Sequence, residues 1–164
     1  MTTAPIAAPP RSQVETVIQS FSDAAEKDQD IYPQIYTAYF RRCPGSDELM
    51  AHTDHRMRGR MMEEVLMLLM ADELSHHEGY LRFETKTHEG YGVKPMMYEN
   101  LLLAVRDTVR ELLGTDWGEV YESAWEGRIA FLGQNIFSAL SDNEAKAMGG
   151  SSQPSTPPGD SWPT

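Results

Sequence analysis

The residues of this chain best suited to bind a metal ion or a cofactor are its histidines. Among 164 residues there are five, namely His52, His55, His76, His77 and His88. The sequence has no Gly-Lys-Ser/Thr phosphate loop, no Gly-x-Ser-x-Gly turn and no Cys-x-x-Cys pair. Those motifs mark nucleotide hydrolysis, α/β-hydrolase chemistry and thiol redox chemistry. Metal or cofactor ligation is therefore the chemistry that the sequence leaves open.

Two short histidine patterns have simpler explanations than a metal site. Glu73 and His76 form Glu-x-x-His, the spacing used in di-iron helix bundles, but such a site needs a second copy that this sequence lacks. His52 and His55 lie near a predicted helix start, with no cysteine or carboxylate cluster to complete a zinc site. We interpret His52 and His55 as solvated residues of a first helical turn.

His88 differs because of the sequence around it, which reads THEGYGVKP from Thr87 to Pro95. The positions of His77, Leu81, Glu84 and His88 predict one helical face, which ends at a glycine-rich turn. Taken alone, a histidine at this place interacts with the negative end of the helix dipole.

Hydrophobic periodicity predicts an all-α chain of about six to eight helices, with no competing strand pattern. Ser12 and Glu15 form a capping box that begins the first helix, which ends near Asp28. Pro33 suits the first turn of a second helix. A long third helix is capped by Thr53 or Asp54.

The remaining helices follow from their apolar stripes. One begins after Pro95 and is closed by Gly114. Thr115 is expected to cap the last helix, with Trp117, Val120 and Leu140 on its inner face. We expect one domain over 11–147, a disordered N-terminus over 1–10, and a disordered Gly/Ser/Pro-rich tail over 148–164.

Composition excludes several classes of partner. Lysine and arginine number 14 and acidic residues 25, so the net charge of −11 disfavours nucleic acid. Cys43 is the single cysteine, which excludes an intrachain disulfide. The sequence shows neither a signal peptide nor the roughly 18 to 20 apolar residues of a membrane span. We therefore expect a cytoplasmic protein without membrane contact.

The surroundings of His88 resemble the globin family. His88, Tyr91, Gly92, Val93, Pro95 and Tyr98 match the proximal segment of bacterial globins, His-x-x-Tyr-Gly-Val-x-Pro followed by Tyr. The segment from Ile35 to Met50 is similar to the family's second helix and the corner after it. The resemblance extends from Val14 to Leu140 and is strongest to bacterial single-domain globins and the globin domain of flavohaemoglobins. It implies a globin-like fold.

The resemblance also implies haem b as cofactor, with His88 as the axial iron ligand. The second ring nitrogen of His88 would donate to a backbone carbonyl one helical turn earlier. Val93 would pack on the porphyrin. Tyr98 would lie beneath the haem, or serve only as a core aromatic residue.

On the opposite, distal side, Tyr36 matches a tyrosine that donates a hydrogen bond to bound dioxygen; as a core residue it needs another partner for its hydroxyl. Two positions depart from the family. Met50 stands where globins carry a phenylalanine stacked on the haem, and Met57 stands where they carry a distal His or Gln. Arg58 takes that place if the helix is shifted by one. Met61 completes a largely apolar distal side.

The resemblance implies a haem-binding globin that reversibly binds O2, as in oxygen transport, with NO and CO as alternative gas ligands. A nitric oxide dioxygenase is a second hypothesis. It needs a separate reductase because the chain is too short for fused flavin and nicotinamide domains. The carboxylate that polarises the proximal histidine in flavohaemoglobins would fall near Leu140. A sensor or interaction module, haem-based or haem-free, is a third hypothesis, because Met50 weakens the usual haem clamp.

Overall fold

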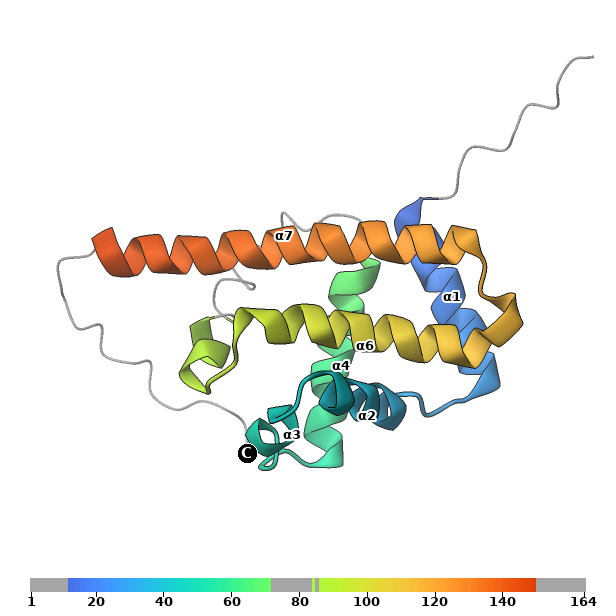
Figure 1. Cartoon of the computed structure of the whole chain (residues 1–164), viewed down its shortest axis with the longest axis horizontal. Helices are drawn as coiled ribbons and strands as arrows, with labels where there is room; N and C mark the ends of the chain where they lie inside the picture. Colours follow the sequence, from blue (N-terminus) through green and yellow to red (C-terminus); the bar gives the residue numbers. More distant parts are fainter. Residues whose placement is uncertain (1–11, 72–83, 85, 150–164) are drawn as a thin grey trace, which may run out of the picture.

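The computed structural model describes residues 12–71, 84 and 86–149, and this part is helical apart from its turns (Figure 1). The helices are α1 (Gln13–Lys27), α2 (Tyr32–Arg42), α3 (Ser46–Leu49), α4 (His55–Met70), α6 (Pro95–Leu113), the 3-10 turn η2 (Gly114–Asp116) and α7 (Glu119–Gly149). Residues 86–90 are also helical. No strand occurs in the described ranges, so the all-α prediction is confirmed for them. No described helix is long and apolar enough to span a membrane.

Several predicted positions lie outside the described residues. They are the expected disordered ends up to residue 11 and from residue 150, the candidate metal-site residues Glu73 and His76, and the helix-face residues His77 and Leu81. The di-iron hypothesis therefore concerns residues that the structure does not describe. At the other end of the domain, α7 continues to Gly149, slightly beyond the expected boundary at 147.

Helix starts follow the local sequence closely. The Ser12 hydroxyl accepts a hydrogen bond from the Glu15 amide at 3.1 Å, as the capping pattern predicts. Asp54, rather than Thr53, caps α4 by accepting from the Met57 amide at 2.8 Å. The Thr53 hydroxyl instead donates to the Met50 carbonyl at 2.6 Å and stabilises the preceding corner.

The predicted start of the last helix is wrong. Thr115 lies within η2 and α7 begins at Glu119. The first helical bond of α7 runs from the Glu122 amide to the Gly118 carbonyl. Along α7, Trp125 is fully buried, whereas Val120, which was expected on the inner face, is 71% exposed.

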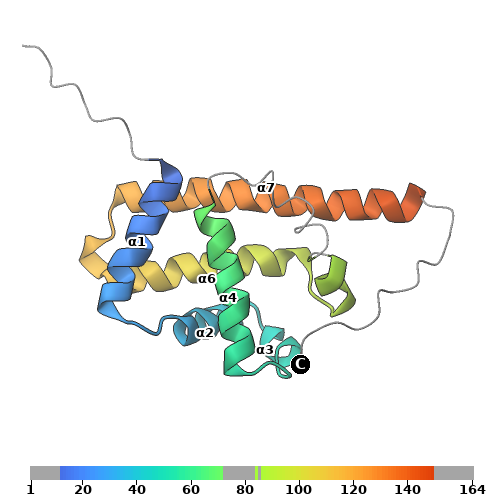
Figure 2. The same ribbon diagram turned by 180° about the vertical axis from the view of Figure 1, so that it is seen from behind.

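The helices are arranged around an antiparallel pair formed by α6 and α7 (Figure 1). Helix α2 packs along α6, and α1 packs against both α6 and α7. Seen from behind, α1 and α4 cross the same face of the α6–α7 pair (Figure 2). One hydrophobic core joins these elements; its members include Val17, Phe21, Ile35, Tyr36, Met62, Leu69, Val105, Val109, Trp125 and Leu132.

The buried residue Arg128 fixes the end of α4 to α7. Its guanidinium donates to the carbonyls of Leu69 at 2.8 Å and Leu68 at 2.9 Å, and also to that of Ala71. The last carbonyls of a helix have no partner within the helix. Arg128 satisfies them and thereby positions the point from which the chain continues toward His88.

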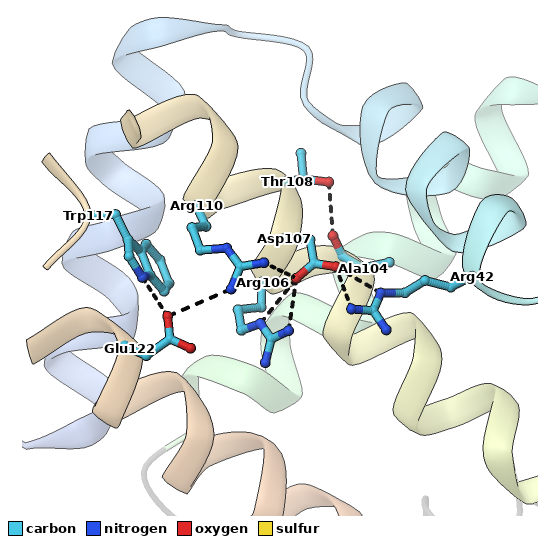
Figure 3. A network of polar contacts seen from close by, with 8 residues as sticks. All are labelled: Arg42, Ala104, Arg106, Asp107, Thr108, Arg110, Trp117 and Glu122. Carbon is cyan, nitrogen blue, oxygen red and sulfur yellow. Dashed lines mark hydrogen bonds and ion pairs between the residues drawn. The ribbon is translucent and has the colours of Figure 1, made fainter. Parts of the chain in front are cut away.

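A second polar network centres on Asp107 of α6 (Figure 3). Its carboxylate is paired with Arg42 of α2 at 2.6 Å, Arg106 at 2.9 Å and Arg110 at 3.1 Å. Arg110 also approaches Glu122 of α7 at 3.8 Å. Burial of the Asp107 carboxyl raises its pKa, but hydrogen bonds and charges from Arg42 and Arg106 outweigh burial and hold the pKa below its usual value. The network therefore stabilises the contact of α2 with α6.

We predict that Asp107→Asn lowers the free energy of unfolding at neutral pH by about 1–3 kcal/mol, because it removes charge-assisted hydrogen bonds to three arginines. A depressed carboxyl pKa contributes stability above the unfolded-state pKa and loses it as pH falls through the folded-state value. The difference between wild type and variant should therefore shrink below about pH 4. Urea unfolding measures both effects. Glu111→Gln, an exposed change on the same helix, is the control, and an equal loss there would contradict the assignment.

Candidate functional site

His88 lies near the end of the helical residues 86–90, which close in a tight turn. Its carbonyl accepts hydrogen bonds from the amides of Tyr91 and Val93, both at 3.0 Å. Gly92 has a φ of +89°, a left-handed conformation that costs glycine little and other residues more. The Gly-Tyr-Gly sequence therefore ends the helix just after His88 and directs the chain into α6.

The imidazole of His88 is held by a hydrogen bond to the chain one turn earlier. Its Nδ1 lies 2.7 Å from the Glu84 carbonyl oxygen. A carbonyl can only accept, so Nδ1 carries the proton and donates. In the neutral ring the lone pair is then on Nε2, the atom that would bind a metal. The hydrogen bond that the resemblance implied for His88 is present.

Two further polar groups lie close to this ring. The Glu84 carboxylate is 3.7 Å from the same Nδ1. Tyr98 of α6 meets the His88 ring edge to face, with 6.3 Å between ring centroids. The Tyr98 hydroxyl is buried and has no hydrogen-bond partner among the described residues. Burial, followed by the charge of Glu84, raises the pKa of Tyr98 to about 12, so the hydroxyl remains a proton donor.

A groove of about 860 Å³ runs between α6 and α7 and has Tyr98 in its wall. Its other apolar lining residues include Met96, Leu102, Leu103, Ile129, Ile136 and Phe137. The volume falls within the range of ligand pockets, but neither His88 nor Val93 is among its lining residues. Val93, also predicted to contact a haem, is half-buried and packs against the edge of the hydrophobic core.

Tyr36 and Arg58 form a separate cluster on the predicted distal side. Tyr36 is 4% exposed, and its hydroxyl donates to the Arg58 carbonyl at 2.9 Å. Burial raises the pKa of Tyr36 to about 12, although Arg58 lowers it in part. The structure thus provides Tyr36 with the partner that a core role requires.

The Arg58 side chain holds the corner between α3 and α4. Its Nε donates to the Thr53 hydroxyl at 2.8 Å and its Nη2 to the Met50 carbonyl at 3.3 Å. The guanidinium also lies over the Phe40 ring, 5.2 Å from the centroid. Its described contacts are therefore those of a structural clamp rather than of a group directed into a ligand pocket.

The three predicted methionines differ in burial. Met50 packs against the core and Met61 is half-buried, whereas Met57 on the first turn of α4 is 39% exposed. Of the residues discussed above, His88, Tyr98 and Glu84 lie together at one place. Tyr36, Arg58 and Met50 lie together at another.

One link between the corner and the His88 turn is not visible in the sequence. Leu49 lies 3.5 Å from the position that a Cβ would take at Gly92. His52 stacks on Tyr91 with 6.4 Å between centroids, although both residues are exposed. Leu49 and Gly92 are 43 positions apart and His52 and Tyr91 are 39 apart, so no local spacing indicates these contacts. The contacts hold the His88 turn against the corner.

Among the residues that the structure describes, no group of three or more His, Cys, Asp or Glu side chains could hold a metal ion. His52 and His55 therefore do not form part of such a cluster there. His88 likewise lies outside any such group, and Nε2 is the ring nitrogen of His88 that carries the lone pair. Neither models of known protein families nor curated proteins match this chain.

We predict that Gly92→Ala costs about 1–2 kcal/mol in the free energy of unfolding, because alanine is strained at a φ of +89°. Gly90, two residues earlier, is helical and has nothing within 4 Å of an added Cβ. Gly90→Ala should therefore be neutral or stabilising by about 0.5–1 kcal/mol. Urea unfolding compares the two variants, and equal effects would show that the turn does not require glycine.

We also predict that Tyr36→Phe lowers the free energy of unfolding by about 1 kcal/mol, because the Arg58 carbonyl loses its hydrogen-bond donor. Tyr91 is 60% exposed, so Tyr91→Phe serves as a control that removes a hydroxyl without loss of a buried bond. Thermal unfolding measures both variants. A neutral Tyr36→Phe would argue against the core role.

Proposed function

We propose that this protein is a haem-binding globin that reversibly binds a diatomic gas at an iron ligated by His88. The observation that carries the proposal is the hydrogen bond from Nδ1 of His88 to the Glu84 carbonyl. It fixes the ring and leaves Nε2 as the basic nitrogen, which is how protein partners prepare a histidine for metal ligation. When bound, haem b supplies the reversible gas binding itself.

The arrangement of helices supports this proposal. Globins pack their helices in pairs around the haem pocket. Here α2 pairs with α6, α1 with α7 and α6 with α7, and α4 contacts α1 and α7. The order of these helices along the chain is the order in which the sequence resembles globins, from Val14 to Leu140.

The residues around His88 fit a haem on its proximal side. A haem needs one basic nitrogen, apolar contact surface and few competing charges. His88 would provide the nitrogen, and Val93 and the apolar residues near Tyr98 would provide surface. The buried Tyr98 hydroxyl has no hydrogen-bond partner among the described residues.

The distal side is expected to give a bound gas little polar support. The single proton of the Tyr36 hydroxyl is used by the Arg58 carbonyl, and the Arg58 side chain is held at the corner. Met50, Met57 and Met61 offer no hydrogen-bond donor. The pocket should therefore hold O2 less tightly, relative to CO, than a pocket with a free distal donor.

The test is reconstitution of the apoprotein with haemin. We expect one haem per chain, with a Soret band that moves when the ferrous form is exposed to CO. His88→Ala should weaken haem binding by more than about 100-fold, because loss of the ligand exceeds the 10- to 100-fold cost of losing its hydrogen-bond partners. His55→Ala is the control, since His55 is exposed on the first turn of α4.

Two outcomes would redirect the proposal. A folded protein that binds no haem would favour the haem-free sensor or interaction module. Haem binding that survives His88→Ala but not substitution of another histidine would move the ligand elsewhere in the chain.

One observation favours nitric oxide dioxygenase as a second candidate. The Glu84 carboxylate lies 3.7 Å from Nδ1 of His88, whereas the position that carries the polarising carboxylate in flavohaemoglobins falls near Leu140. This candidate needs a separate reductase. For either candidate we propose a cytoplasmic location. Rapid consumption of NO by the oxygenated protein, sustained by a cellular reductant, would support it.

A further inference from the structure

A small pocket between α2 and α6 gathers positive charge in a chain whose net charge is −11. Its volume is about 290 Å³, and three arginines line it. Arg41 and Arg42 come from the last turn of α2, and Arg110 comes from the last turn of α6. Cations favour the last turn of a helix because they oppose its dipole, but this preference does not supply them with an anion.

The Asp107 carboxylate, which also lines this pocket, is already saturated with donors (Figure 3). Its Oδ1 accepts from Nε and Nη2 of Arg106 at 3.2 and 2.9 Å, and from Nη2 of Arg110 at 3.1 Å. Its Oδ2 accepts from Nε of Arg42 at 2.8 Å and lies 2.6 Å from Nη2 of the same residue. These contacts fill the roughly four lone-pair positions of a carboxylate. Asp107 therefore has no capacity left for another donor.

The arginines of the pocket, by contrast, keep unused donors. Each guanidinium carries five N–H groups in a planar fork. Nη1 of Arg110 is 3.8 Å from the Glu122 carboxylate, which is too far for a hydrogen bond. Arg41 is exposed and forms no ion pair with a described residue, and neither does Glu111, the other acidic residue that lines the pocket.

The charge balance around the pocket is positive. Four arginines stand against three carboxylates, which leaves one surplus positive charge: Arg41, Arg42, Arg106 and Arg110 against Asp107, Glu111 and Glu122. Like charges held this close repel one another, so an added anion lowers the energy of the cluster. The net charge of −11 repels extended anionic surfaces such as nucleic acid or a lipid bilayer, whereas a small anion responds mainly to the local field.

We propose that this pocket binds the phosphate groups of a small soluble compound through Arg41, Arg42 and Arg110. The planar fork of arginine matches the oxygens of a phosphate group and can donate to two of them at once. The pocket is large enough for one or two phosphate groups and lies at the junction of two helices. A bound phosphate compound therefore joins the end of α2 to α6 and stabilises the folded protein. This inference does not depend on haem.

Inorganic pyrophosphate is the probe for this site. Isothermal titration calorimetry of the full-length protein at low salt measures the Kd and the stoichiometry. We expect one pyrophosphate per chain, with a Kd that rises as NaCl is added. The thermal unfolding midpoint should rise with pyrophosphate and not with NaCl at the same ionic strength. In NMR spectra, the Nε–H signals of Arg42 and Arg110 should shift during the titration.

Arg41→Gln is the sharpest variant, because Arg41 is exposed and its loss breaks no described ion pair. It should raise the Kd for pyrophosphate by roughly tenfold and leave the urea unfolding midpoint unchanged in the absence of the probe. Arg56→Gln is the matched control. Arg56 is an exposed arginine of α4 outside the pocket, and its substitution changes the net charge by the same amount. It should change the Kd by less than about twofold.

Several results would overturn the inference. Absence of pyrophosphate binding at low salt would refute it directly. Equal weakening by Arg41→Gln and Arg56→Gln would show that only the net charge matters, and equal stabilisation by NaCl would show that screening explains the effect. Binding to vesicles that contain phosphatidic acid, without binding of pyrophosphate, would assign the arginines to a lipid headgroup and reject a soluble ligand. Since none of these measurements involves haem, each result leaves the proposed function unaffected.

Discussion

The central position of α6 is the constraint on which the rest of this structure depends. α6 contacts α1, α2 and α7, and fully buried Val105 and Val109 lie at its middle. It begins at Pro95, directly after the turn that follows His88, so its packing decides where that turn lies. The same helix carries Tyr98 beside His88 and Asp107 beside Arg42. Core packing and the candidate site are therefore set by one element.

The two candidate sides of the site are built by different means. On the His88 side, polar groups are concentrated around one ring nitrogen, and the Tyr98 hydroxyl is buried without a described partner. On the Tyr36 side, the hydroxyl donates to the Arg58 carbonyl. The Arg58 guanidinium donates to the Thr53 hydroxyl and the Met50 carbonyl. The His88 side therefore has a buried hydroxyl without a described partner, whereas the polar groups of the Tyr36 side are bonded within the protein.

This asymmetry bears on the choice among functions. Under the proposed function, a distal side with few donors would give weak selective support to bound O2. The resemblance to globins suggested reversible gas binding first, because the position of the polarising carboxylate on the last helix falls near Leu140. Glu84 places a charge at the same ring from the helix that carries His88.

Sequence by itself determined the helical class, most helix starts and the turn after His88. Ser12, Asp54 and Gly92 act on amides or dihedral angles within four residues, so their effects can be read from neighbouring letters. Even the bond from His88 to the Glu84 carbonyl is an i to i−4 contact of one helix.

Only the tertiary structure decided how distant residues were paired. The Tyr36 hydroxyl donates to the Arg58 carbonyl, 22 residues away, and Arg42 forms an ion pair with Asp107. Leu49 of the corner lies against Gly92 in the His88 turn. The buried face of α7 was also decided by packing: Trp125 is buried and Val120 is exposed. The physical reason is that hydrophobic periodicity specifies which face of a helix is buried, whereas the partner of that face, and the charge environment of a buried group, depend on how whole helices pack.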